Sequence, residues 1–382
     1  MWSEDLLGYD FGPGHPMDPL RLELTERLIE DLDVAGHFRV VAPRLATDEE
    51  LALVHDPEYI RIVREAGRTG RAPASSGLGD ADTPIFPGIH AAAARIAGAA
   101  VQAAGMIIAG ETVRAFSFAG GMHHAMPGAA AGFCVYNDAA VAIASVRAAG
   151  PIVYVDLDVH HGDGVQRAFL DDPWVTTVSL HQHPRSLYPH TGYPGEIGGG
   201  TGLGHCVNVA LPEDVTDAEW LRAIDAVVTP VVREVRPAML VTQHGCDTHI
   251  DDPIGGLRIS IEAQREAALL MRALADTHCG GRWLALGGGG YDVAGAVPRV
   301  WAHVAAVVAG VEVDPAAPTP QRWRDHVLRV TGRAAPVTMG DGVPVAWKPF
   351  HAGHNPASAI DRAIMATRTA AFPSLGLDPL TA

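Results

Sequence analysis

Apolar positions along the chain follow two patterns, short continuous runs and longer segments with helical spacing, and the two patterns alternate. Short runs rich in β-branched residues predict buried strands, while apolar residues three and four apart predict helices that cover them. The predicted strands are residues 114–118, 152–155, 175–180, 238–242 and 283–286, and the predicted helices are residues 20–34, 89–109, 138–149, 165–170, 217–234, 261–277 and a last one ending at 309.

This alternation predicts an α/β fold in which one mainly parallel sheet carries helices on both faces. Residues 71–88, rich in Gly, Ala, Pro and Asp, predict a long surface loop. Beyond Val313 a segment rich in Pro and Ala begins. We therefore expect a main domain over residues 1–312 and a C-terminal extension over residues 313–382, packed on that domain or appended to it.

Composition narrows the classes of function. The net charge is −16 and no Lys/Arg-rich block occurs, which excludes direct nucleic-acid binding and favours a cationic substrate or a basic protein segment. Four scattered cysteines without a C-x-x-C pair argue against disulfides and a cysteine zinc site. No signal segment and no membrane-spanning window is present, so we expect a cytoplasmic protein without a membrane partner.

The densest cluster of chemical groups is Asp-Leu-Asp-Val-His-His-Gly-Asp-Gly at residues 156–164, directly behind a predicted strand. In an extended backbone Asp156, Asp158 and His160 would lie on one side. Two oxygen donors and one nitrogen donor aimed together favour a divalent metal site. A polar strand end that caps the next helix is the alternative, and the cost of packed like charges counts against it.

Other polar motifs also follow predicted strands. Parallel sheets bind ligands beyond the carboxyl ends of their strands, so these motifs should converge on one crevice. They are Gly120-Gly-Met-His-His124, His181, Gln243-His-Gly-Cys-Asp247 and Gly287-Gly-Gly-Gly-Tyr291. A metal ion there would have three protein ligands, Asp158, His160 and Asp247, and one open coordination position, as in catalytic zinc sites. Such an ion lowers the pKa of water toward neutrality.

The remaining groups suit acid–base chemistry. His123 and His124 can exchange protons and stabilise charge, and Asp156 and Asp163 can orient them. Tyr291, behind a bare glycine loop, can donate a hydrogen bond to an oxyanion. G-x-G-x-x-G, the P-loop and G-x-S-x-G are all absent, which disfavours nucleotide binding and a covalent nucleophile. The residues indicate metal-assisted hydrolysis.

Together these motifs resemble the zinc-dependent histone deacetylase superfamily, in the family's order and over about residues 5–310. Gly132-Phe-Cys-Val-Tyr-Asn-Asp138 and Gly12-Pro-Gly-His-Pro also fit. The Tyr-Asn-Asp form is similar to class I enzymes. The extension, with Pro349-Phe-His-Ala-Gly-His-Asn-Pro356 and Phe372-Pro-Ser-Leu-Gly-Leu-Asp-Pro379, looks like that of bacterial acetoin utilization deacetylases.

The resemblance implies an arginase-like, three-layer α/β fold and removal of acetyl groups from lysine side chains. It assigns zinc to Asp158, His160 and Asp247, with iron(II) as the alternative metal. It makes His124, paired with Asp163, the principal general base and acid. His123 and Asp156 form a second, more buried dyad, and Tyr291 polarises the acetyl carbonyl.

The resemblance also implies a substrate channel and a second ion. Phe133 and Tyr188 would grip the lysine stem, with Gly132 beside them, and Asp82 would hold the substrate backbone at the rim. Asp80 competes with Asp82 for that role. The family places potassium near the zinc, here at Asp156, Asp158, His160, Ser179 and Leu180. Two residues depart from the family's pattern and alter the channel mouth. Tyr188 stands where many relatives carry Phe, and His190 interrupts the usual Pro-Gly-Thr-Gly turn.

Three alternatives remain open. The first is an amidohydrolase of the same fold that acts on acetylated polyamines, so the partner is an acetylated protein or an acetylated small amine. The second is a manganese hydrolase of the arginase kind, with two ions and with His123 and His124 as ligands. The third is an inactive acetyl-lysine binding module, against which the complete set of catalytic groups argues.

Overall fold

A single sheet of six parallel strands forms the centre of the protein in a computed structural model that describes residues 1–381. The strand order is β1-β6-β5-β2-β3-β4. The strands are β1 (Arg114–Ser117), β2 (Ile152–Asp156), β3 (Val175–Gln182), β4 (Cys206–Leu211), β5 (Met239–Gln243) and β6 (Trp283–Leu286). The predicted parallel α/β fold is confirmed.

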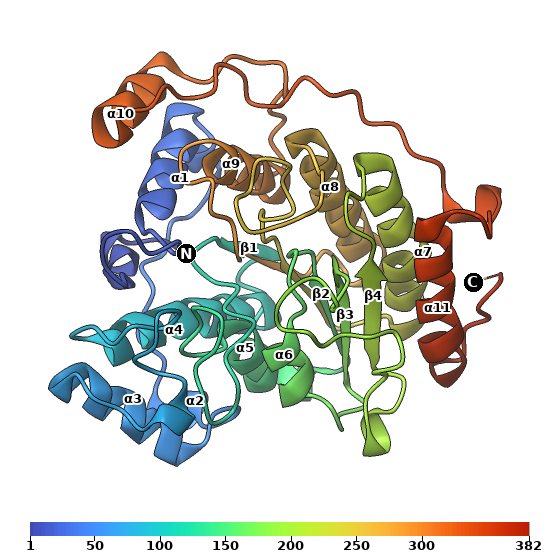
Figure 1. Cartoon of the computed structure of the whole chain (residues 1–382), viewed down its shortest axis with the longest axis horizontal. Helices are drawn as coiled ribbons and strands as arrows, with labels where there is room; N and C mark the ends of the chain where they lie inside the picture. The colour runs from blue at the N-terminus through green and yellow to red at the C-terminus, as the bar shows by residue number, and fades with distance from the viewer. Residues whose placement is uncertain (382) are drawn as a thin grey trace.

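Helices cover both faces of this sheet, which gives the three-layer arrangement that the resemblance implies (Figure 1). One layer holds α4 (Ile89–Ile108), α5 (Asp138–Val146) and α6 (Asp163–Ala168). The opposite layer holds α1 (Leu20–Asp31), α7 (Asp217–Val235), α8 (Ile261–His278) and α9 (Ala296–Ala309). The strands are buried throughout apart from the start of β1, because both faces are covered.

The sequence prediction of five strands missed β4 at the edge of the sheet. No helix joins β3 to β4: residues 183–205 are irregular except for one short 3-10 turn. The alternation of strand and helix that marked the other strands therefore fails here. The short helices α2 (Asp48–Leu51) and α3 (Pro57–Thr69) were also missed, whereas residues 71–88 form the predicted loop around one 3-10 turn.

Helix α4 is the one helix within residues 1–381 that is long and apolar enough to cross a membrane. Most of it lies inside the protein, where it packs against α5, β1 and β6. Its alanines permit this close packing, and Ala97 and Ala100 are fully buried. The apolar composition of α4 is explained by its place in the core.

The chain reverses its direction of travel across the sheet between β2 and β5. These two strands are neighbours, yet β2 continues to β3 on one side and β5 continues to β6 on the other. Open α/β sheets bind ligands at such a point, beyond the carboxyl ends of the two strands. Asp156 and Gln243 lie opposite each other at this place, so the polar motifs behind β2 and β5 meet there.

The C-terminal extension runs across the α8–α9 side of the molecule between α10 (Gln321–Thr331) and α11 (Ala359–Ala371) (Figure 1). Helix α11 packs beside β4 and α7, and the Thr367 hydroxyl donates to the carbonyl oxygen of Asn208 in β4 at 2.6 Å. A helix in this place covers the edge strand, which would otherwise expose unpaired backbone groups.

A buried ion pair joins the extension to α7. The Arg222 guanidinium donates from Nε to Asp361 Oδ1 at 2.6 Å and from Nη2 to Asp361 Oδ2 at 2.9 Å. Arg222 also donates to the carbonyl oxygens of Lys348, Pro349 and Gly353. Both side chains of the pair are almost fully buried, so each charge depends on the other.

We predict that Asp361→Ala lowers the free energy of unfolding by about 3–5 kcal/mol, since it leaves the Arg222 charge buried without its partner. Urea unfolding followed by circular dichroism would measure this change. Glu58→Ala, which breaks an exposed pair with Arg61 on α3, is the control and should leave the unfolding midpoint where it is. Equal midpoints for wild type and Asp361→Ala would contradict the prediction.

Candidate active site

Three predicted metal ligands meet where β2 and β5 end. One donor atom each from Asp158, His160 and Asp247 lies within 4.8 Å of the others, and all three side chains are buried. His160 Nδ1 lies 3.0 Å from Asp158 Oδ1 and 3.1 Å from Asp247 Oδ2. Two carboxylate oxygens and one imidazole nitrogen therefore face a common point.

Neighbouring groups fix the outer oxygens of the two carboxylates. The side-chain amide of Gln243 and the backbone N–H of Gly289 both donate to Asp158 Oδ2, at 2.7 and 2.8 Å. The backbone N–H of Val159 donates to Asp247 Oδ1 at 2.9 Å. A Cβ atom on Gly289 would lie 2.0 Å from Asp247 Oδ2, so only glycine fits there. The inner oxygens remain directed at the common point.

The charges of this group fit a bound cation. Burial, followed by the charge of Asp158, raises the pKa of Asp247 above its usual range, because two buried carboxylates this close repel each other with only His160 between them. Burial opposes protonation of His160, yet the two carboxylates raise its pKa to about 10. A divalent ion at the common point would relieve this repulsion, and two oxygens with one nitrogen are suitable zinc ligands.

Two histidine–aspartate dyads lie beside the ligands. His123 Nδ1 lies 2.8 Å from Asp156 Oδ2, and His124 Nδ1 lies 2.7 Å from Asp163 Oδ1. The two Nε2 atoms are 3.1 Å apart. Tyr154, two positions before Asp156, donates its hydroxyl to the same Asp156 oxygen at 2.7 Å. The structure thus pairs the histidines and carboxylates as the family resemblance implies.

The two imidazoles differ in protonation. Burial and the positive charge of His123 lower the pKa of His124 to about 4, so His124 is neutral at pH 7. Burial works against the charge on His123, but Asp156 and Asp158 outweigh it and raise the pKa of His123 to about 9. Asp163 accepts from Nδ1 of His124, so the lone pair of that ring is on Nε2, which faces Nε2 of His123.

Tyr291 follows the glycine run and faces Phe133, with ring centroids 5.8 Å apart in an edge-to-face arrangement. Its backbone N–H donates to Asp252 Oδ2 at 2.8 Å, which fixes the position of the Tyr291 backbone. Burial, followed by the charges of Asp247 and Asp158, raises the pKa of the phenol well above 10. The hydroxyl therefore keeps its proton and can donate it in a hydrogen bond.

Aromatic side chains surround the dyad of His124. The Tyr188 ring lies 5.0 Å from the His124 ring, edge to face, and Tyr188 is 40% exposed. Phe133 adopts a left-handed backbone conformation with φ of 67°. Gly132 precedes it, and a Cβ atom there would lie 2.4 Å from the His124 ring. Of the predicted channel residues, Gly132 and Tyr188 thus lie against His124, and the ring of Phe133 faces Tyr291.

The two rim aspartates are distinguished by their contacts. Asp80 Oδ1 accepts from the backbone N–H groups of Asp82 and Thr83, at 3.1 and 2.8 Å, so this carboxylate is used inside its own turn. The carbonyl oxygen of Asp82 lies 3.1 Å from His15 Nε2, and its side chain is exposed. His15 in turn packs edge to face on Phe133. Of the two carboxylates, which both belong to exposed residues, that of Asp82 is the one that accepts no backbone N–H of this turn.

Three of the predicted potassium ligands lie on neighbouring strands, and the other two, Asp158 and His160, follow β2. Ser179 of β3 is directly opposite Asp156 of β2, and Leu180 follows it. The Ser179 hydroxyl is hydrogen-bonded to His181 Nδ1 at 2.9 Å. His161, which sequence reasoning left without a role, is bonded to Thr191 Oγ1 at 2.9 Å and to Gln166 Oε1 at 3.1 Å. It therefore supports the loop that carries Tyr188.

Sequence reasoning missed several residues that hold the site. Gln243 and Tyr154 were inside motifs already noted, and the two-residue spacing of Tyr154 and Asp156 could have indicated that they share a face. Arg21 donates to the carbonyl oxygens of Gly288 and Gly290 from 267 and 269 positions away in the chain. No local pattern reveals such a contact, and the same holds for Asp252.

Comparison with known proteins shows the family of this chain. The family model described as "Histone deacetylase domain" matches residues 15–308. The chain belongs to the histone deacetylase family. It is 37% identical over 379 residues to the acetoin utilization protein AcuC of Bacillus subtilis (strain 168), with 97% of each chain covered. It is 34% identical over 328 residues to AcuC of Staphylococcus xylosus, with 85% of each covered.

Membership of this family identifies the protein as a hydrolase of the deacetylase type. The suspected kinship with acetoin utilization proteins is confirmed, and the match to AcuC of Bacillus subtilis includes the C-terminal extension, because it covers nearly the whole chain. The four cysteines are free and buried, as the sequence predicts. The family is typically metal-dependent, which agrees with the three converging ligands.

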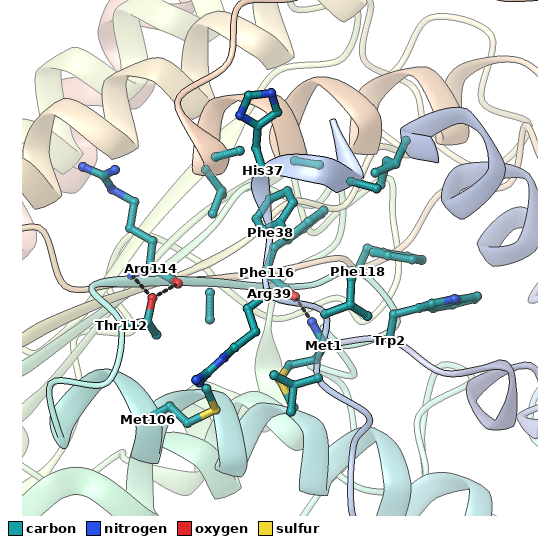
Figure 2. Close-up of a pocket in the computed structure, with 18 of the residues that line it drawn as sticks. Met1, Trp2, His37, Phe38, Arg39, Met106, Thr112, Arg114, Phe116 and Phe118 are labelled. Atoms are coloured by element: carbon teal, nitrogen blue, oxygen red, sulfur yellow. Dashed lines mark hydrogen bonds between the residues drawn. The ribbon is translucent and has the colours of Figure 1, made fainter. Parts of the chain in front are cut away.

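A separate cavity of about 250 Å³ lies at the outer edge of β1. Figure 2 shows Phe38, Phe116 and Phe118 around it, and none of the predicted site residues lines it. Glu26 of α1 also lines this cavity. Burial, together with the charge of Glu30, raises the pKa of Glu26 to about 7.

We predict that Glu26→Gln stabilises the protein above pH 7. The folded state binds its Glu26 proton more tightly than the unfolded state, so stability falls as the pH rises from about 4.5 to about 7. Glutamine at this position removes that loss of stability. The difference in stability between the variant and the wild type should vanish below about pH 4.5. Thermal unfolding at pH 4.5 and pH 8 measures it, with the exposed Glu213→Gln as control. A variant less stable than wild type at pH 8 would refute the assignment.

Proposed function

We propose that this protein is a zinc-dependent lysine deacetylase that hydrolyses the acetyl amide of acetyl-lysine in proteins. The convergence of Asp158, His160 and Asp247 beside two histidine–aspartate dyads carries the proposal. A zinc ion held by these three ligands would supply a water of lowered pKa and polarise the acetyl carbonyl. Iron(II) suits the same ligands, and the cytoplasm is the expected location.

His124 acts as the general base and then as the general acid. Its neutral Nε2 accepts a proton from the attacking water, while Asp163 at Nδ1 stabilises the imidazolium that forms. The same nitrogen then returns the proton to the lysine amine as the amide bond breaks. His123, held by Asp156, forms the second dyad and would stabilise charge near the developing oxyanion.

Tyr291 stabilises the oxyanion. Its phenol stays protonated because burial and two carboxylates raise its pKa, so it can donate a hydrogen bond to the acyl oxygen as charge grows there. The Gly289 backbone, which approaches Asp158 without a side chain, brings the phenol close to the ligands. Asp252 fixes the Tyr291 backbone for the same purpose.

The substrate channel accounts for recognition of the lysine stem. Phe133 and Tyr188 would contact its methylene groups, Gly132 would leave room next to His124, and Asp82 would accept hydrogen bonds from the peptide backbone. We also propose potassium at Asp156, Asp158, His160, Ser179 and Leu180, on the basis of the family resemblance and the opposition of Asp156 and Ser179. The overall charge of −16 suits a basic protein segment.

We predict that Tyr291→Phe lowers kcat by about 100–1000-fold, because one oxyanion donor is lost. His124→Ala should lower kcat by about 100–10,000-fold, because proton transfer is lost. Both variants should keep the wild-type melting temperature within a few degrees. Tyr193→Phe, at a partly exposed tyrosine outside the site, is the control. Full activity of either site variant would refute the mechanism.

Metal removal should abolish activity, and one equivalent of Zn²⁺ per chain should restore it. The assay compares acetyl-lysine peptides with acetylspermidine and acetylputrescine, with metal content measured in the same preparations. We expect faster turnover of the peptides, expressed as kcat/KM. Preference for the acetylpolyamines would change the substrate class, and two manganese ions per chain would indicate arginase-like chemistry. Peptide binding without turnover would indicate a binding module.

A further inference from the structure

The segment between β5 and α8 carries two groups of the site. Residues 247–259, called the ligand loop here, begin at Asp247 and include Asp252, which accepts from the Tyr291 backbone. The loop contains no helix or extended strand, and a β-bridge between His249 and Ile259 closes it on itself. Contacts with other parts of the chain add to this internal pairing.

His249 is the buried centre of this loop. Its backbone N–H donates to the carbonyl oxygen of Cys246 at 3.1 Å, closing a turn around Asp247. Its Nδ1 accepts from the backbone N–H of Asp251 at 3.1 Å. The proton of the neutral ring therefore lies on Nε2, which must donate to a partner because the side chain is fully buried.

That partner comes from the C-terminal extension. Asp341 Oδ2 lies 3.0 Å from His249 Nε2, across 92 positions of sequence. The same oxygen accepts from the backbone N–H of Ile261 at 2.8 Å, and Oδ1 accepts from Arg299 at 3.1 Å. The Asp341 carboxylate thus links three segments. It contacts the ligand loop through His249, the start of α8 through Ile261 and helix α9 through Arg299.

Asp341 is itself held in place. Glu262, in the first turn of α8, accepts from the backbone N–H groups of Asp341 and Gly342 at 3.0 and 2.8 Å. Arg299 also donates to the carbonyl oxygen of Gly340 at 2.9 Å. A Cβ atom on Gly340 would lie 2.4 Å from Glu262, so the turn fits closely on α8. These contacts give Asp341 a fixed position from which to hold His249.

We infer that Asp341 is a positioning residue for the reaction, which acts through His249 to hold Asp247 in place for metal binding. This inference rests on the proposed metal-dependent function. Asp341 lies beyond residues 15–308, the part of the chain that the family model matches. The extension therefore completes the site from outside the matched domain. Groups that orient metal ligands in this way commonly contribute 10–100-fold in metal affinity or activity, roughly.

The test measures binding of Zn²⁺ to the metal-free full-length protein by competition with a chromophoric chelator, without any acyl substrate. Asp341→Ala should weaken binding about 10–100-fold. At saturating Zn²⁺ its kcat should fall while KM changes less than about twofold, since Asp341 touches no substrate. Asp314→Ala, an exposed aspartate of the extension that accepts from the backbone of Ala316, is the matched control and should bind as wild type does.

Two further variants separate positioning from general stability. His249→Gln should weaken Zn²⁺ binding similarly, and the double variant with Asp341→Ala should be no weaker than the worse single variant, because both break one contact. If Asp341→Ala does not fold, Asp341→Asn keeps the size of the side chain and should show a smaller loss.

Folded Asp341 variants that melt at lower temperature, yet bind Zn²⁺ and turn over as wild type does, would overturn the inference. Wild-type protein that binds no divalent metal would instead refute the proposed function. The two failures are thereby distinguished, since the first leaves metal binding by the wild type intact.

Discussion

The repulsion between Asp158 and Asp247 is the constraint on which the rest of the structure depends. Two carboxylates are buried with their inner oxygens directed at one point, and a single imidazole lies between them. Such an arrangement is unfavourable unless donors hold the outer oxygens and a cation occupies the centre. The donors are the Gln243 amide and the backbone N–H groups of Gly289 and Val159.

The topology makes this arrangement attainable. Where β2 and β5 lie side by side and the chain leaves them in opposite directions, no connecting helix covers their carboxyl ends. Two ligands follow one strand and the third follows the other. The glycine run behind β6 then lets backbone approach where a side chain would collide with Asp247.

Much of this site could be predicted from the sequence because its groups lie in short motifs behind strands. Spacing placed Asp158 and His160 together, and the rule for parallel sheets brought Asp247 to them. Strand β4 could not be recognised by alternation, since an irregular segment replaces the usual helix before it. Contacts such as Arg21 to Gly288 and Asp341 to His249 join distant segments, and only the folded chain reveals them.

The close fit of Gly132 against His124 has a consequence for how this channel can diverge. Any side chain at position 132 would displace the His124 imidazole, and Phe133 is held in a left-handed conformation by the same turn. In the proposed channel, acyl selectivity is therefore best altered at the opposite wall, where Tyr188 is 40% exposed. The Tyr188 ring lies 5.0 Å from the His124 ring, so a substitution there also changes the packing of that imidazole.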